Sequence, residues 1–132
     1  MTGLIWTIQI LQYPSFALVP REQFVGFHAR HSRNITYIVL PMMAVELATA
    51  ALLVINNPVS TFFWINAGGV ISLWLSTFLI SVPLHSALAK GKSLDVIRRL
   101  VITNWPRTIL WSCRFGLLIY IFLAGVGHVS IR

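Results

Sequence analysis

Charged residues are scarce in this chain, and acidic residues are the scarcest. The 132 residues include three Asp or Glu, ten Lys or Arg, and a single cysteine, Cys113. One cysteine excludes a disulfide within the chain. Charged residues make up 10% of the sequence and hydrophobic residues 57%, so a soluble core of this size cannot cover the apolar side chains. The composition therefore predicts an integral membrane protein that is covered mostly by the lipid bilayer.

The sequence also lacks the motifs of the standard soluble chemistries. It contains no glycine-rich phosphate loop, no Ser/His/Asp arrangement, no paired catalytic carboxylates, no C-x-x-C pair and no haem-attachment motif. The net charge of +7 would indicate nucleic acid in a soluble domain, but here the basic residues cluster between apolar runs. We interpret them as loop charges that face anionic lipid headgroups, and we expect no nucleic-acid partner. The sequence predicts no particular cofactor.

Four apolar runs approach the roughly 20 residues that cross about 30 Å of hydrocarbon. They cover residues 3–19, 35–55, 61–82 and 109–127. The first run is short and contains Pro14, so it must kink, tilt or begin near the membrane surface. We expect it to be retained, because no clear cleavage site follows it. Residues 1–132 are thus expected to form one all-α domain, an integral membrane four-helix bundle.

Residues 94–104 have the pattern of a short amphipathic helix on the membrane surface. Leu94, Ile97 and Leu100 recur at helical spacing, while Asp95 lies on the opposite side. We expect Pro106 to separate this interfacial helix from the fourth span.

The basic residues predict an orientation. Residues 20–34 carry three arginines and residues 83–108 carry five Lys or Arg, whereas residues 56–60 carry no charge. Because Lys and Arg prefer the cytoplasmic side, both long connections are expected inside and both termini outside. The expected location is a bacterial inner membrane.

Glu46 lies half-way along the second apolar run. A carboxylate at the centre of a membrane helix costs about 2.5 to 3.5 kcal/mol, so it usually faces a protein interior. Three runs each present one polar stripe at helical spacing: Met42, Glu46 and Thr49; Thr77, Ser81 and His85; and Arg107, Trp111 and Arg114. Three interpretations remain open. Glu46 and Arg114 form a structural ion pair, or Glu46 and His85 handle protons in a catalytic site where Arg114 sets their charge, or Arg114 extends to the lipid headgroups. Gly68, Ser72 and Ser76 are expected to form a close-packing edge.

Histidines form a second candidate site. His28, His31 and His85 are expected at the same membrane face, where neutral imidazoles could hold zinc, copper or iron. The alternative is that His28 and His31 belong to a solvated loop that touches lipid.

Polar and aromatic residues form a third candidate site at the start of the fourth span. Asn104, Trp105, Arg107 and Trp111 suit the rim of a site for an anionic headgroup, a phosphate or a quinone-like ligand. The alternative is an aromatic belt with its basic anchors.

Two stretches carry a family resemblance. VPLHSAL at residues 82–88 and NWPRTILWSCR at residues 104–114 resemble a group of small bacterial four-span membrane proteins of unknown function. HSR at residues 31–33 and PMMAVE at residues 41–46 are similar to the same group. More distantly, the chain resembles the anthrone-oxygenase-like membrane domain, whose relatives are implicated in oxidising polyketide anthrones. The resemblance implies a four-span fold and, from the distant group, chemistry on a hydrophobic substrate.

Three classes of function are compatible with these features. The first is a membrane-embedded enzyme or redox protein acting on a hydrophobic substrate. The second is an accessory or structural subunit of a larger membrane complex, or a homo-oligomer, that binds lipid or pigment. The third is a small proton-coupled transporter, because the small multidrug resistance proteins also combine four spans with one membrane glutamate.

Overall fold

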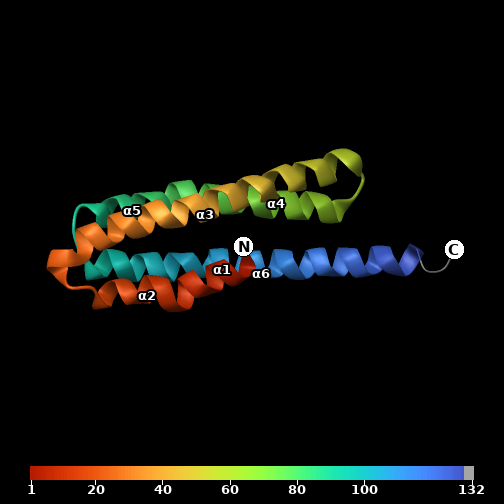
Figure 1. Ribbon diagram of the computed structural model, residues 1–132. Coiled ribbons are helices and arrows are strands. Elements are labelled where there is room, and N and C mark those ends of the chain that lie inside the picture. The colour runs from red at the N-terminus through yellow and green to blue at the C-terminus, as the bar shows by residue number, and fades with distance from the viewer. Residues whose placement is uncertain (130–132) are drawn as a thin grey trace.

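Helices make up almost the whole chain. The computed structural model describes the backbone of residues 1–129 and the side chains up to Ala124, and no strand occurs in this part. The N-terminal stretch consists of α1 (Thr2–Thr7), the π-helical turn η1 (Ile8–Gln12), α2 (Tyr13–Ser15) and the 3₁₀ turn η2 (Phe16–Leu18). It is followed by α3 (Arg21–Asn56), α4 (Thr61–Ser76), the π-helical turn η3 (Thr77–Ser81), α5 (Val82–Ala89) and α6 (Leu94–Val129) (Figure 1). The all-α prediction is confirmed for the described residues.

Three helical stretches are long and apolar enough to cross a membrane. They cover Arg21–Asn56, Thr61–Ala89 and Leu94–Ala124. Stretches of this length and composition are typical of an integral membrane protein. The predicted first span, residues 3–19, is instead divided into short helical pieces.

A proline follows each of the two π-helical turns. Pro14 follows the end of η1 by two residues, and Pro83 follows the end of η3 by two residues. Proline lacks the N–H that an α-helix needs, and its ring clashes with the preceding turn. A π-helical turn relieves this conflict by adding one residue to the helix, and such turns occur often at functional sites. Both turns border the cavity described below.

The N-terminal stretch runs antiparallel along the first half of α6 (Figure 1). Thr2 Oγ1 donates a hydrogen bond to the Trp111 carbonyl at 3.3 Å, and Gln9 Nε2 donates to the Val101 carbonyl at 3.1 Å. At the end of the N-terminal stretch, Lys92 Nζ donates to the carbonyls of Ala17 and Val19, at 2.8 and 2.6 Å. Meanwhile α3 packs against α4 and α5, and α4 packs against α6.

Two expected connections turn out to be largely helical. Residues 20–34 form the first turns of α3, and α5 continues to Ala89 before a short turn leads into α6. The separate interfacial helix predicted over residues 94–104 is wrong, since these residues are the start of α6, which continues through Pro106. The helix continues because it has a buried face before and after Pro106. This face includes Leu100 and Trp111 and packs against the N-terminal stretch and the other helices.

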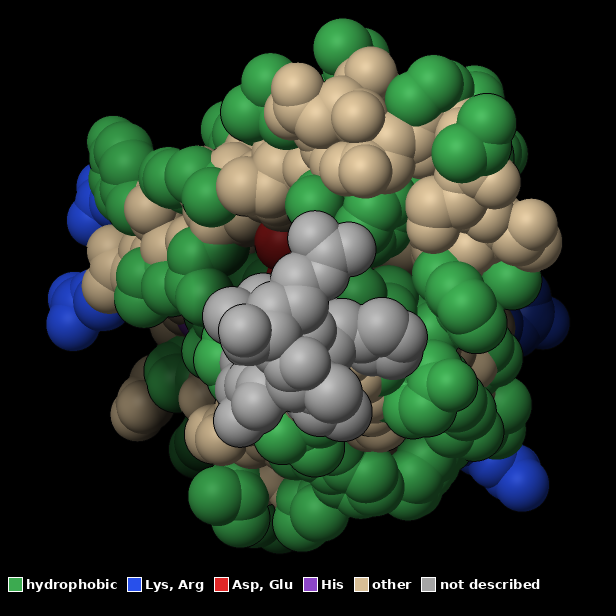
Figure 2. Space-filling view, turned by 90° about the vertical axis from the view of Figure 1, so that its right-hand side faces the viewer, with side chains coloured by type: hydrophobic (Ala, Val, Ile, Leu, Met, Phe, Trp, Pro, Cys, Tyr) green, Lys and Arg blue, Asp and Glu red, His purple; other side chains and the backbone are tan. Residues whose placement is uncertain are grey.

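The two ends of the molecule differ in charge. The end with the turn over residues 90–93 carries Arg21, Lys90 and Lys92. In the view onto the opposite end, with the turn over residues 57–60, the side chains are mostly apolar or uncharged, one small acidic patch is visible, and Lys and Arg appear only at the margins of the view (Figure 2). The prediction for the C-terminus itself concerns residues outside the described part.

Candidate functional site

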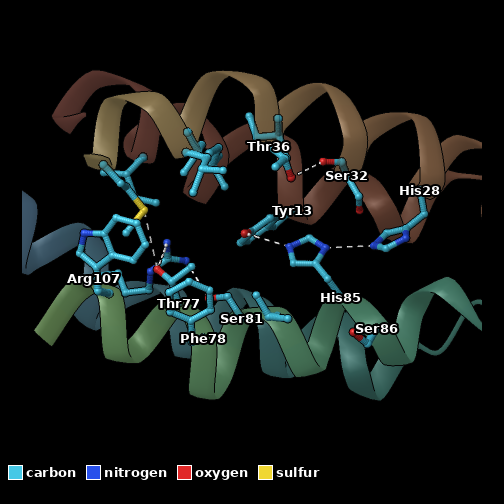
Figure 3. A pocket seen from close by; sticks show the side chains of 18 of the residues that line it. Tyr13, His28, Ser32, Thr36, Thr77, Phe78, Ser81, His85, Ser86 and Arg107 are labelled. Carbon is cyan, nitrogen blue, oxygen red and sulfur yellow. Dashed lines mark hydrogen bonds between the residues drawn. The ribbon is translucent and has the colours of Figure 1, made fainter. Parts of the chain in front are cut away.

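A cavity of about 490 Å³ lies between α3 and the stretch from α4 to α5, beside the N-terminal helices. Its lining is mainly apolar, with side chains such as Ile8, Ile35 and Met43. Polar side chains face one another across it (Figure 3): Tyr13, His28, Ser32, Thr36, Thr77, Ser81, His85, Ser86 and Arg107. Apolar cavities with a few convergent polar groups are the usual form of small-molecule sites.

Three of these side chains form a hydrogen-bonded chain along the cavity wall (Figure 3). The Tyr13 hydroxyl lies 3.2 Å from Nε2 of His85, and Nδ1 of His85 lies 3.0 Å from Nε2 of His28. Both ring nitrogens of His85 are therefore engaged. Nδ1 of His28 is buried and has no hydrogen-bond partner among the described residues. Because a neutral imidazole donates at one nitrogen and accepts at the other, such a chain can pass a proton along its length.

His31 lies beside this chain without joining it. Its ring stacks on His85 with 6.1 Å between centroids and contacts Phe16 edge-on at 4.9 Å. His28, His31 and His85 thus gather as predicted, but within the described residues no three His, Cys, Asp or Glu side chains are placed to hold a metal ion. The reason is that His28 and His85 point their nitrogens at each other rather than at a common centre.

Arg107 reaches the cavity from α6 and is buried, with 5% of its surface exposed. Its Nη1 donates to Ser81 Oγ at 2.8 Å and to Asn104 Oδ1 at 3.0 Å, and its Nη2 donates to Thr77 Oγ1 at 3.1 Å. Its Nε is buried without a partner in the described part of the chain. The Tyr13 side chain lines the same cavity.

A second polar centre lies outside the cavity. Arg114 Nη1 is 3.1 Å from Glu46 Oε2, and Trp111 Nε1 donates to the same oxygen at 2.9 Å. Arg114 Nε donates to Asn66 Oδ1 at 3.2 Å. The structure therefore contains the predicted Glu46–Arg114 ion pair, which ties α3, α4 and α6 together. Neither partner lines the cavity.

The predicted catalytic residues are thus divided between two places. His85 lies in the cavity, whereas Glu46 and Arg114 pair with each other outside it. The predicted rim is divided as well. Arg107 lines the cavity, whereas Asn104 and Trp111 are buried but are not part of its lining. Trp105 is 42% exposed and contacts Trp6 edge-on, away from the cavity.

Sequence reasoning missed two residues that shape these centres. Tyr13 lies in the first apolar run, where sequence reasoning gave it no role in a site, and its position directly before Pro14 was the available signal. Gly69 leaves room for the Arg114 side chain, because a Cβ added at Gly69 would lie 2.9 Å from Arg114 Cδ. The sequence predicts close packing at Gly68 instead, but a Cβ added there would meet nothing within 4 Å.

Comparison of the chain with protein-family models, with curated proteins and with solved structures gave no match.

Proposed function

We propose that this protein is a membrane-embedded enzyme or redox protein that moves a proton to or from an oxygen atom of a hydrophobic substrate. The observation that supports this proposal is the hydrogen-bonded chain of Tyr13, His85 and His28 on the wall of an apolar cavity. The apolar lining would hold the body of the substrate. The Tyr13 phenol would contact its oxygen, a geometry that suits general acid–base chemistry.

The proton balance along the chain is complete. Tyr13 gives its proton to the substrate oxygen and receives one from Nε2 of His85. Nδ1 of His85 then receives a proton from Nε2 of His28, and Nδ1 of His28, which is buried in this structure, would take one from a hydronium ion that reaches it from the headgroup region and leaves as water. The reverse sequence removes a proton from the substrate. Arg107, which lines the same cavity as Tyr13, would stabilise negative charge on the substrate oxygen.

The position of the cavity supports this function in a four-helix membrane bundle with its basic end in the cytoplasm. Helix α3 has 36 residues, hence a length of about 54 Å, which exceeds the roughly 30 Å of bilayer hydrocarbon. The cavity follows α3 from His28 to Met43. The cavity therefore extends to both sides of residue 35, where the predicted second span begins. In this placement the substrate would enter from the lipid hydrocarbon and protons would enter from the headgroup region.

Glu46 is less suited to this task than the histidine chain. Its carboxylate accepts from both Arg114 and Trp111 and lies outside the cavity. This pairing disfavours a proton-coupled transporter that relies on Glu46. The same pairing favours the second candidate function, an accessory subunit whose helices are held together by Glu46 and Arg114.

The proton transfer can be tested with 2-naphthol, a hydrophobic phenol that releases its proton in the excited state when an acceptor is in contact. Bound to the purified protein in a neutral detergent, 2-naphthol should emit as naphtholate. Tyr13→Phe should shift the emission to neutral naphthol, because the phenol that links substrate and His85 is lost. Tyr37→Phe removes the same hydroxyl from an exposed tyrosine outside the cavity and should have no effect. Neutral emission from the wild-type complex would contradict the proposal.

A further inference from the structure

Arg107 carries a positive charge that no acidic residue balances. The chain has three acidic residues, and all lie in its described part. Glu46 pairs with Arg114, while Glu22 and Asp95 are exposed in the first turns of α3 and α6. The ion pair between Glu46 and Arg114 is the one such pair among the described residues. Arg107 is therefore buried without a counter-ion in this part of the chain.

The surroundings of Arg107 satisfy its hydrogen bonds only in part and its charge not at all. Ser81, Asn104 and Thr77 are neutral acceptors, and the Nε atom is buried with no acceptor. A buried charge is strongly disfavoured unless an opposite charge accompanies it. A guanidinium in this state is suited to bind an oxyanion through charge-assisted hydrogen bonds.

The cavity determines the rest of the ligand. Arg107 lies at one end of it, close to Thr77 and Ser81, while the remaining walls are mainly apolar (Figure 3). A small inorganic anion would leave these walls without contacts. An apolar body with one anionic oxygen group would fill the cavity and neutralise the arginine together.

We infer that the cavity binds a hydrophobic monoanion, a compound with an apolar body and a single carboxylate or phenolate group, with its oxyanion on Arg107. This inference rests on the proposed function insofar as it takes the cavity to be the substrate site. Arg107 and Tyr13 line the same cavity, so the group that binds the charge and the group that exchanges the proton can act on one ligand.

Two pyrene probes of nearly the same size test the inference. 1-Pyrenebutyrate carries a carboxylate, and 1-pyrenebutanol carries a neutral hydroxyl on the same body. Fluorescence titration of the wild-type protein in neutral detergent, corrected for partition into empty micelles, should give binding of the carboxylate that is about tenfold tighter. That ratio corresponds to about 1.4 kcal/mol. Equal affinities for the two probes would overturn the inference, and this comparison needs no variant.

Variants then locate the preference. Arg107→Gln should reduce the tenfold ratio to about one while leaving the affinity for 1-pyrenebutanol nearly unchanged, and Arg107→Lys should keep part of the ratio. Arg99→Gln removes an exposed charge from the same helix and should leave the ratio unchanged. Persistence of the preference in Arg107→Gln would overturn the assignment.

The outcomes separate this inference from the proposed function. A carboxylate preference that depends on Arg107, together with neutral 2-naphthol emission, supports the anion site and rejects proton transfer. Naphtholate emission together with equal binding of both pyrene probes supports proton transfer and rejects the anion site.

Discussion

Two arginines on one face of α6 have opposite electrostatic surroundings. Arg107 and Arg114 are seven residues apart, and both are buried, with 5% and 6% exposure. Arg114 has the Glu46 carboxylate at 3.1 Å, whereas all side-chain oxygens that accept from Arg107 are neutral. Helix α3 supplies the carboxylate near one arginine and borders a cavity near the other. The compensated charge fastens helices, and the uncompensated charge faces a space that a ligand can occupy.

Trp111 lies between the two arginines and contacts both centres. Its indole N–H donates to Glu46, while the Arg107 guanidinium carbon lies 5.3 Å from the centroid of its ring. A cation near an aromatic face is attracted to it, but the ring carries no net charge. Trp111 thus orients the carboxylate toward Arg114 without supplying a counter-ion to Arg107.

The largest effect is expected from breaking the compensated pair. Glu46→Gln keeps a hydrogen-bond acceptor for Trp111 but leaves the buried Arg114 charge unpaired, which should lower the free energy of unfolding by about 3 kcal/mol. SDS titration of the purified protein measures this change. Adding Arg114→Gln to Glu46→Gln should recover part of the loss, because no unpaired charge then remains. Additive losses in the double variant would show that the two side chains are not coupled.

A smaller effect is expected from the glycine beside Arg114. Gly69→Ala places a Cβ 2.9 Å from Arg114 Cδ, and overpacking of this kind typically costs about 1 to 3 kcal/mol. The arginine must shift, so the distance to Glu46 changes as well. Gly68→Ala is the matched control: its Cβ meets nothing within 4 Å, and alanine is favoured over glycine in a helix by up to about 1 kcal/mol. Equal thermal shifts for both variants would mean that Gly69 does not position Arg114.

The pattern of polar residues predicted much of the compensated centre. Helical spacing placed Glu46, Trp111 and Arg114 on inward faces, and the cost of a membrane carboxylate indicated that Glu46 needs a partner. The apolar runs likewise predicted the all-helical fold, and three of the four predicted spans fall within long apolar helices. These features follow from local periodicity, which is read directly from the chain.

The uncompensated centre could not be predicted in the same way. Arg107 and Arg114 have the same residue type and lie on the same face, and nothing in the sequence indicates that a cavity lies beside Arg107; that depends on how α3, α5 and the N-terminal helices pack. Tyr13 follows a π-helical turn, whose extra residue shifts the period by which its direction would be predicted. The hydrogen bond between Tyr13 and His85 also joins segments 72 residues apart, a contact set by tertiary packing.

The smallest effect on stability is expected at Arg107. Arg107→Met removes three hydrogen bonds to neutral groups, but it also removes the cost of burying an unpaired charge, and replacing buried ionic groups by apolar ones is often neutral or stabilising. The free energy of unfolding without ligand should therefore change by less than about 1 kcal/mol, as measured by the same SDS titration. Arg114→Met is the control, since it strands the Glu46 carboxylate and should lower stability by about 3 kcal/mol. An equal loss in both variants would show that Arg107 stabilises the helix packing as Arg114 does. Its charge would then serve the fold and would not be available to bind a ligand.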